Sequence, residues 1–245
     1  MGKVVRYIYT GYCFIPFLLS FFLIIPVYFV IFNFWPKNSA QHTAHKVSRF
    51  WASLLFFFFF MRVEIKNQHL IDSDKTYIFI ANHLSMLDIP LYARSCVNTF
   101  RFLAKAELTK IPLLGYIINN LYISVKRTEK TDRVKSIEKM LLTLKEGISV
   151  FIAPEGTRNK TSKSLLDFHD GAFRLAIAAQ QPLAILTILN THHHLSPANI
   201  LQMKPGILKA VWSQPIETVG MTELDITCLK ELARNKMLVI LEKDQ

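Results

Sequence analysis

The sequence has few cysteines, and they are far apart. Its 245 residues include three, Cys13, Cys96 and Cys228. This odd number at wide spacing excludes a disulfide framework and a cysteine-based zinc site. Internal repeats, low-complexity linkers and an RNP-type aromatic motif are also absent from the sequence. These absences argue against a disulfide scaffold, a repeat protein and a nucleic-acid-binding module.

Acidic residues are scarce as well. There are 18 Asp and Glu but 29 Lys and Arg, which gives a net charge of +11. A basic surface attracts phosphate groups, whether on nucleic acid, on anionic lipid or on a substrate. Hydrophobic residues make up 51% of the chain, so we expect a folded protein that contacts lipid rather than nucleic acid. The length suits one sizeable α/β domain.

A long stretch near the N-terminus has no charge. Between Arg6 and Lys37 every residue is neutral, and a helix over residues 7–36 would be about 45 Å long, more than the roughly 30 Å core of a bilayer. A signal peptide is the alternative, but the run is long for one and no small-x-small cleavage site follows, which favours a retained anchor. Pro16 and Pro26 predict either a kinked crossing or a helical hairpin.

A second uncharged run, residues 50–61, is too short to cross a bilayer. We expect it to lie at the interface, to insert into one leaflet or to pack in the core. Basic residues after the first run outnumber those before it, so the positive-inside rule places the rest of the chain on the cytoplasmic face. Residues 1–66 are thus predicted to form a membrane-associated helical segment, and residues 67–245 an α/β domain.

Beyond residue 66, short β-branched and aromatic runs alternate with amphipathic stretches. This alternation predicts a central mixed, largely parallel sheet flanked by helices. The predicted strands are 77–81, 99–103, 121–125, 149–153, 183–188 and 208–212. The predicted helices are 85–94, 113–119, 132–145, 171–179 and 222–242, with Gly147 as a helix stop.

The first candidate site is the string Asn-His-Leu-Ser-Met-Leu-Asp at residues 82–88. A histidine with a carboxylate to orient it is the minimum apparatus for activating a hydroxyl by general-base catalysis. Residues five apart point about 140° apart on a helix. His83 and Asp88 therefore meet only if His83 lies in the turn and Asp88 near the helix start, with Ser85 as N-cap. The alternative is a chance His-x4-Asp whose Asn-His pair only caps a turn.

The second candidate site is Pro-Glu-Gly-Thr-Arg at residues 154–158, after the predicted strand 149–153. Ligand sites in α/β sheets favour the carboxyl ends of strands. Gly156 allows the backbone to approach a ligand closely, and Arg158 can bind a phosphate with two donors. The alternative is a surface turn with an ordinary ion pair between Glu155 and Arg158.

In this order the two motifs resemble the signature of the glycerolipid acyltransferases, most closely the 1-acylglycerol-3-phosphate acyltransferases. The resemblance runs over residues 77–189 and includes Arg-Phe-Leu-Ala-Lys-Ala-Glu-Leu at 101–108 and Leu-Tyr-Ile-Ser-Val-Lys-Arg at 121–127. It implies that His83 and Asp88 are catalytic. The residues that it implies at the substrate are Lys105, Arg127, Glu155, Gly156, Thr157 and Arg158. Of these, the three cations would surround the phosphate, and Glu155 would bind the glycerol portion or position Arg158.

The sequence departs from this family in places. Ala153 stands where Phe is usual, Asp167 and His169 replace the usual Pro and Lys, and the segment 181–186 lacks a second proline. These changes bear on acyl or acceptor preference and remove no catalytic group. The three histidines at 192–194 are interpreted as a polar loop, because consecutive histidines in a strand alternate faces and cannot all bind one ion. No metal site is expected.

The resemblance implies an enzyme that moves a fatty acyl group from acyl-CoA or acyl-carrier protein to the sn-2 hydroxyl of lysophosphatidic acid, giving phosphatidic acid. The acyl thioester would be a co-substrate, with no cofactor, and membrane lipid a further partner. Transfer should be direct, because neither motif holds a cysteine and Ser85 has no second base. Backbone amides near His83 or Gly156 are the candidate oxyanion donors. The alternatives are an acyltransferase for glycerol-3-phosphate or another lysophospholipid, and a non-catalytic phospholipid-binding membrane protein.

Overall fold

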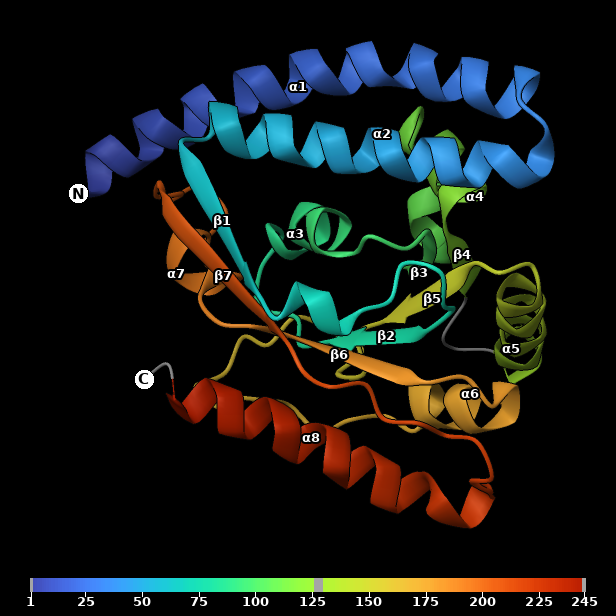
Figure 1. The fold of residues 1–245 in the computed structure, drawn as a ribbon. Coiled ribbons are helices and arrows are strands. Elements are labelled where there is room, and N and C mark those ends of the chain that lie inside the picture. Colours follow the sequence, from blue (N-terminus) through green and yellow to red (C-terminus); the bar gives the residue numbers. More distant parts are fainter. Residues whose placement is uncertain (1, 126–129, 244–245) are drawn as a thin grey trace.

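A mixed sheet forms the centre of the protein. The computed structural model describes residues 2–125 and 130–243. In that part of the chain seven strands pair in the order β1-β7-β6-β2-β5-β3-β4 (Figure 1). The strands are β1 (Met61–Lys66), β2 (Ile78–Ala81), β3 (Phe100–Lys105), β4 (Ile123–Val125), β5 (Ser149–Ile152), β6 (Leu183–Ile188) and β7 (Gly206–Trp212).

Most neighbouring strands run in parallel. β2 pairs in parallel with β5 and β6, and β3 with β5 and β4. β7 is antiparallel to β6 and parallel to β1. The predicted mixed, largely parallel sheet is confirmed. Because parallel strands end at the same edge, the carboxyl ends of β2, β3, β4, β5 and β6 share one edge of the sheet.

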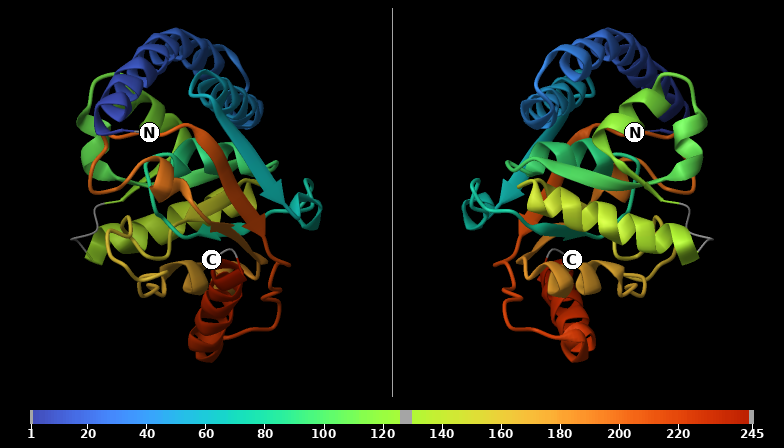
Figure 2. Two further views of the ribbon diagram at one scale, coloured as in Figure 1. Left: turned by 90° about the vertical axis from the view of Figure 1, so that its left-hand side faces the viewer. Right: turned by 90° about the vertical axis from the view of Figure 1, so that its right-hand side faces the viewer.

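Helices cover both faces of this sheet (Figure 2). They are α1 (Lys3–Phe34), α2 (Lys37–Phe58), α3 (Asp88–Ser95), α4 (Leu114–Leu121), α5 (Lys130–Lys145), α6 (Gly171–Ala179), α7 (Thr191–His194) and α8 (Ile226–Lys243). Short 3-10 turns lie at Gln68–Leu70, Ala106–Lys110 and Glu223–Asp225. α2 and α3 pack on one face, and α5, α6 and α8 on the other, so the sheet is buried between two helical layers.

The two N-terminal helices form a hairpin in which α2 packs on the sheet and α1 lies outside α2 (Figure 1). α1 is continuous for 32 residues and runs through both prolines, and the chain turns back only at Trp35 and Pro36. The two helices are joined by hydrogen bonds such as Tyr28 to Ser48, with 2.7 Å between the hydroxyl oxygens. The chain thus does not reverse at Pro16 or Pro26. Each proline removes only one helix hydrogen bond, while packing on α2 holds the rod together.

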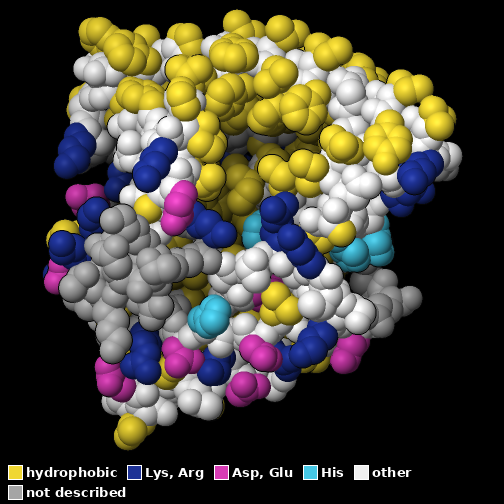
Figure 3. All heavy atoms as spheres, turned by 180° about the vertical axis from the view of Figure 1, so that it is seen from behind, with side chains coloured by type: hydrophobic (Ala, Val, Ile, Leu, Met, Phe, Trp, Pro, Cys, Tyr) yellow, Lys and Arg dark blue, Asp and Glu magenta, His cyan; other side chains and the backbone are white. Residues whose placement is uncertain are grey.

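Among the described residues, α1 alone is long and apolar enough to cross a membrane. Many of its large apolar side chains are exposed, and a band of hydrophobic side chains covers the α1–α2 region in Figure 3. The run 50–61 packs partly in the core, which is one of the three positions expected for it. Phe56 and Phe59 are buried in the core, whereas Phe57 and Phe60 are exposed.

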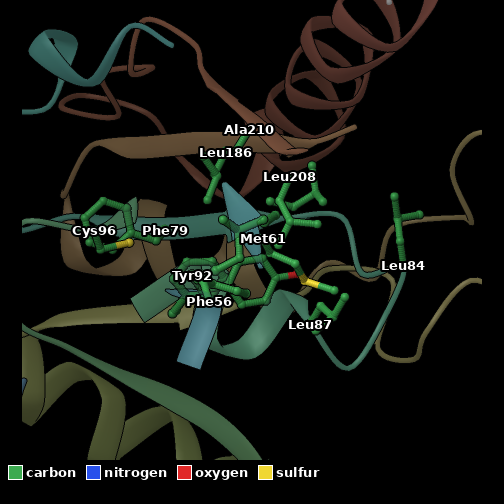
Figure 4. Close-up of a cluster of buried hydrophobic side chains, with 14 of the residues drawn as sticks. Phe56, Met61, Phe79, Leu84, Leu87, Tyr92, Cys96, Leu186, Leu208 and Ala210 are labelled. Carbon is green, nitrogen blue, oxygen red and sulfur yellow. The ribbon is translucent and has the colours of Figure 1, made fainter. Parts of the chain in front are cut away.

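The hydrophobic pattern of the strands explains the layering. In β2, Ile78 and Ile80 point to the cluster beneath α5, α6 and α8, and Phe79 and Ala81 point to the cluster beneath α2 and α3. Figure 4 shows part of this second cluster, where side chains of α2, α3, β2 and β7 meet. Burying one such side chain stabilises the fold by about 1.5–3 kcal/mol. β2 is therefore held in register from both faces.

Most predicted elements are present. β6 and α6 have the predicted bounds, and the other predicted strands are present within two residues at each end. β1 was not predicted, although its alternating sequence is typical of an edge strand. The three histidines lie in the short helix α7 rather than in a loop. The division of the chain at residue 66 stays a prediction; β1, which precedes it, pairs with β7.

Candidate active site

The carboxyl edge of the sheet brings the two motifs together. His83 follows β2 by two residues, and residues 154–158 follow β5, its parallel neighbour. Lys105 is the last residue of β3, and Thr191 begins α7 shortly after β6. Four segments that are distant in the sequence therefore contribute polar side chains to one region, as expected for a ligand site in an α/β sheet.

The ring of His83 is held by Asp88. Nδ1 of His83 lies 2.8 Å from Oδ2 of Asp88, so the expected hydrogen bond is present. Because an ionised carboxylate only accepts, Nδ1 carries the proton and Nε2 has the lone pair. Nε2 makes no hydrogen bond within residues 2–125 and 130–243, and the side chain is 19% exposed. The ring presents a basic nitrogen to the space outside.

Asp88 is fully buried, and both of its oxygens are hydrogen-bonded. Besides the His83 ring, Oδ2 accepts from the amides of Leu84 at 2.6 Å and Ser85 at 2.8 Å. Oδ1 accepts from the hydroxyl of Thr191. These four donors compensate for the water that a buried charge has lost. The carboxylate is thus fixed in place before any substrate binds.

The helix after this turn begins later than predicted. α3 starts at Asp88 and has Leu87 at its N-cap position, so the predicted start and cap at Ser85 are wrong. The reason is the Asp88 carboxylate. It accepts from the amides of Leu84 and Ser85 and so holds these two residues in a turn instead of a helix. The Ser85 hydroxyl instead donates to the carbonyl of Leu195, at 2.7 Å.

Asn82 fastens the active-site turn to the sheet. Its Nδ2 donates to the carbonyl of Ile188 at 2.8 Å, and its Oδ1 accepts from the amide of Ile188 at 2.7 Å. This side chain is fully buried and continues the β2–β6 ladder beyond the end of β2. The hydroxyl of Tyr92 donates to the Asn82 carbonyl from α3. The position of His83 is therefore set by the sheet.

Glu155 links the two motifs from a buried position. It is 3% exposed. Oε1 accepts from the amide of His83 and Oε2 from the amide of Leu166, each at 2.9 Å. Burial raises the pKa of this carboxyl, and the two hydrogen bonds partly offset that effect. Both oxygens bind backbone, so the geometry gives Glu155 a positioning role and does not support the surface turn with an ion pair to Arg158.

The rest of the second motif is more open. Gly156 has a φ of 68°, a conformation that glycine adopts without strain, and its turn exposes Thr157. Arg158 is half-buried, and its buried Nη1 has no hydrogen-bond partner in the described part of the protein. A buried guanidinium nitrogen without an acceptor is costly, so a ligand that supplies one is favoured.

The other two predicted phosphate ligands differ in what the structure shows. Lys105 is exposed at the end of β3, on the same sheet edge as His83. Arg127 lies outside the described residues. The position of Lys105 is compatible with a role at the substrate, which stays a prediction.

Thr191 was not identified from the sequence. Its hydroxyl contacts Asp88, 103 residues away in the chain, and its side chain is fully buried. The rule that singled out the two motifs, a polar residue just after a buried apolar strand, also applies to it. The neighbouring His192 is half-buried, and burial lowers its pKa. No group of three or more His, Cys, Asp or Glu side chains that could hold a metal is found among the described residues.

The backbone amides suggested as oxyanion donors have partners within the protein. The amides of residues 83–85 donate to the carboxylates of Glu155 and Asp88. The amide of Gly156 donates to the carbonyl of Ala153 at 3.0 Å. An amide bonded in this way is not free to bind an oxyanion. In this arrangement these amides stabilise the turn rather than a reaction intermediate.

A hollow opens on one face of the molecule, beneath the hydrophobic band of the α1–α2 region. Figure 3 shows it lined by hydrophobic side chains, with Lys or Arg and His side chains along its lower rim. An apolar hollow beside basic groups suits a ligand with a hydrocarbon chain and an anionic head.

Comparison with known proteins supports an acyltransferase. The family model described as Acyltransferase matches residues 62–189, more than half of the chain. The crystal structure of the 1-acyl-sn-glycerophosphate acyltransferase PlsC from Thermotoga maritima is similar, with a TM-score of 0.84 and 25% identity over 99% of this chain and 97% of that one.

Curated proteins give the same picture. An uncharacterised acyltransferase of Schizosaccharomyces pombe is 31% identical over 73% of this chain and 66% of its own length. A chloroplastic 1-acyl-sn-glycerol-3-phosphate acyltransferase of Brassica napus is 27% identical over 79% of this chain and 54% of its own length. The chain thus spans about half to two thirds of the curated relatives. These similarities confirm the resemblance to glycerolipid acyltransferases.

Proposed function

We propose that this chain, which belongs to the Acyltransferase family, transfers a fatty acyl group from an acyl thioester to the sn-2 hydroxyl of lysophosphatidic acid, giving phosphatidic acid. The observation that carries the proposal is the buried Asp88 carboxylate bonded to His83. The same sheet edge holds a guanidinium nitrogen of Arg158 that has no partner in residues 2–125 and 130–243. A base and an anion-binding group at one edge suit an acceptor that carries both a hydroxyl and a phosphate.

The His83–Asp88 pair provides the proton chemistry. Nε2 takes the proton of the acceptor hydroxyl as its oxygen attacks the thioester carbonyl. Asp88 keeps the ring in the tautomer with a proton on Nδ1 and stabilises the imidazolium that forms. When the carbon–sulfur bond breaks, the thiolate leaves and receives the proton back from Nε2. The products are the ester and a free thiol, and the histidine returns to its starting state.

The acceptor phosphate is bound on the β5 side of the site. Nη1 of Arg158 gains the acceptor that it lacks within the described part of the chain, and Lys105 and Arg127 add positive charge in this proposal. A guanidinium and a phosphate form short, charge-assisted hydrogen bonds with a fixed orientation. Thr157 is exposed beside Arg158 and supplies a further hydroxyl. Binding the phosphate here brings the neighbouring glycerol hydroxyl towards His83.

The apolar parts of the molecule suit lipid substrates. The hollow in Figure 3 receives hydrocarbon chains, and the exposed apolar side chains of α1 associate with the membrane in which the acceptor lies. The α/β part would then lie at the cytoplasmic face, as the distribution of basic residues indicates. The acyl thioester of CoA or of acyl-carrier protein is a co-substrate, and the reaction includes no other cofactor.

The proposal is direct transfer without an acyl-enzyme. The Ser85 hydroxyl is buried and donates to the Leu195 carbonyl, so it is not placed as a nucleophile. Cys13 and Cys96 are buried in the core, and Cys228 is exposed on α8, away from the sheet face that carries α3. Labelled acyl groups should not accumulate on the protein during a single turnover.

Release of thiol from acyl-CoA and from acyl-carrier protein, with and without lysophosphatidic acid in mixed micelles, tests the proposal. We expect release that depends on the acceptor, together with phosphatidic acid detected by mass spectrometry. Turnover with glycerol-3-phosphate or another lysophospholipid instead would change the acceptor. Binding of lysophosphatidic acid without turnover of either donor would indicate a phospholipid-binding protein.

A further inference from the structure

A cavity lies at the turn of the helical hairpin. Its volume is about 300 Å³. Its lining includes Phe32 and Trp35 from the end of α1, Lys37 and Gln41 from the start of α2, Arg101 of β3 and Asn120 of α4. Arg101 is the second residue of β3 and Lys105 the last, so this hairpin-turn pocket lies towards the opposite sheet edge from His83.

The hairpin-turn pocket is positively charged. Lys37 and Arg101 are the charged residues among its described lining, which includes no carboxylate. The Nε of Arg101 is buried and has no hydrogen-bond partner in the described chain, while Nη2 donates to the Asn120 carbonyl at 3.2 Å. Burial lowers the pKa of this guanidinium, as happens to a cation that has lost water. A ligand with anionic oxygens would compensate it.

Glu146 does not neutralise Arg101 by direct contact. Glu146 lines an adjoining hollow together with His42 and Arg101, and its charge favours the protonated guanidinium. In the described residues, no ion pair within 4 Å joins the side chains of Glu146 and Arg101. His42 is engaged by the Thr99 hydroxyl at 2.8 Å. The positive charge in the hairpin-turn pocket is therefore available to a ligand.

Hydrophobic side chains border the same pocket. Phe32 and Trp35 belong to its lining, and Phe34 beside them is 74% exposed. Phe29 and Val30 continue this exposed apolar surface along α1. The hairpin-turn pocket thus joins two cations and side-chain amides to an apolar surface. Inorganic phosphate would use only the polar part, whereas a phospholipid would use both.

We propose that the hairpin-turn pocket binds the phosphate of an anionic phospholipid in the membrane, with its acyl chains along the exposed apolar side of α1. Such a lipid holds the turn of the hairpin at the level of the headgroups. It is neither acceptor nor product in the active site, since the two sites lie towards opposite edges of the sheet. The inference rests on the membrane association within the proposed function, and not on the acyl transfer.

Binding of the full chain to phosphatidylcholine vesicles with and without phosphatidylglycerol tests this site. Lys37→Gln should weaken binding to the anionic vesicles about tenfold, the effect of losing one hydrogen bond to a charged group. Arg101→Gln should do the same, and Arg101→Lys should recover part of the loss. Binding to pure phosphatidylcholine should not change. Lys46→Gln removes the same charge from the exposed face of α2, outside the pocket, and should have at most about a twofold effect.

Equal losses for Lys37→Gln and Lys46→Gln would mean a diffuse electrostatic attraction and would overturn the proposal. Phosphatidylglycerol brominated on its acyl chains should quench Trp35, and Trp35→Phe should remove that part of the quenching. A further contradicting result is that inorganic phosphate weakens binding to the anionic vesicles and yet leaves the quenching of Trp35 unchanged. That result would mean that the pocket holds a phosphate ion and not a lipid headgroup. Acyl transfer in detergent micelles should be unaffected by Lys37→Gln, so vesicle binding and catalysis fail separately.

Discussion

The turn at residues 82–88 and the loop at residues 154–158 form two halves of one site, and they differ in how their polar groups are satisfied. In the turn, Asp88 is fully buried and has donors on both oxygens. In the loop, Arg158 keeps a buried nitrogen without a partner among the described residues, and Thr157 is exposed. The difference shows that the polar groups of the turn are held by the protein itself, whereas in the proposed function the substrate phosphate supplies the partner of Arg158. Changes in the turn should lower the rate, and changes in the loop should weaken binding.

Asp88→Asn should have the largest effect. The asparagine side chain keeps only one acceptor oxygen, its NH2 group can only donate, and it carries no negative charge. It therefore cannot accept all four bonds that Asp88 receives, and the ring loses the charge that fixes its orientation and tautomer. We expect kcat to fall by about 10⁴-fold, as for the corresponding change in hydrolase triads. Steady-state kinetics measure the fall in kcat, and urea unfolding measures any change in the free energy of unfolding. Ser85→Ala, which leaves the amide of the turn intact, is the control. A variant that keeps its rate would show that the carboxylate does not orient the base.

Arg158→Gln should weaken substrate binding by the loop at residues 154–158. It removes the guanidinium that we place on the acceptor phosphate, so KM for lysophosphatidic acid should rise about tenfold to a hundredfold. kcat should stay nearly constant if the interaction contributes equally to ground state and transition state. Lys160→Gln, an exposed cation two residues further along, is the matched control. An equal rise in KM for both variants would argue against a specific contact.

Thr191→Val tests the outer support of the turn. The variant keeps the shape of the side chain but removes the donor to Oδ1 of Asp88, so we expect kcat to fall about tenfold, the effect of losing one hydrogen bond to a charged group. Thr191→Ser should restore the rate, because it restores the hydroxyl. Failure of serine to restore activity would indicate that packing, and not the hydroxyl, matters.

Glu155→Gln should have the smallest effect. It should change how the free energy of unfolding depends on pH. Burial raises the pKa of Glu155 in the folded protein, so the folded state holds this proton more tightly than the unfolded chain. That contribution is present below the unfolded pKa and is lost as the pH rises through the folded pKa. Glutamine does not titrate, so the variant does not lose stability in this way as the pH rises. Its free energy of unfolding relative to the wild type should therefore increase across that window in urea titrations, and a constant difference would refute the raised pKa.

The sequence predicted those features that depend on local pattern. β6 and α6 follow from uninterrupted apolar periodicity, and the His83–Asp88 bond from the need for one residue in a turn and the other at a helix start. It did not predict Asn82 as a bridge to Ile188 or Thr191 as a donor to Asp88. These contacts join residues more than 100 positions apart, and periodicity carries no information on them.

The roles within the second motif also depended on tertiary structure. Glu155 and Arg158 are both charged and only three residues apart. Glu155 is buried against two backbone amides, whereas Arg158 has a nitrogen without a partner among the described residues. The strand end fixed where the motif lies, but the path of the following loop decides which charge turns inwards. β1 was not predicted although its residues alternate, because a short run with three charged residues is also compatible with a surface loop until it pairs with β7.

The most direct test compares His83→Ala and Arg158→Gln with two acceptors, lysophosphatidic acid and a monoacylglycerol that lacks the phosphate. With each acceptor, acyl transfer from the preferred thioester is measured as kcat/KM. The two-part site predicts that His83→Ala loses about 10⁴-fold with both acceptors, as much as Asp88→Asn. Arg158→Gln should lose activity only with the acceptor that carries phosphate. An Arg158→Gln variant equally impaired with both acceptors, or a His83→Ala variant that remains active, would contradict it.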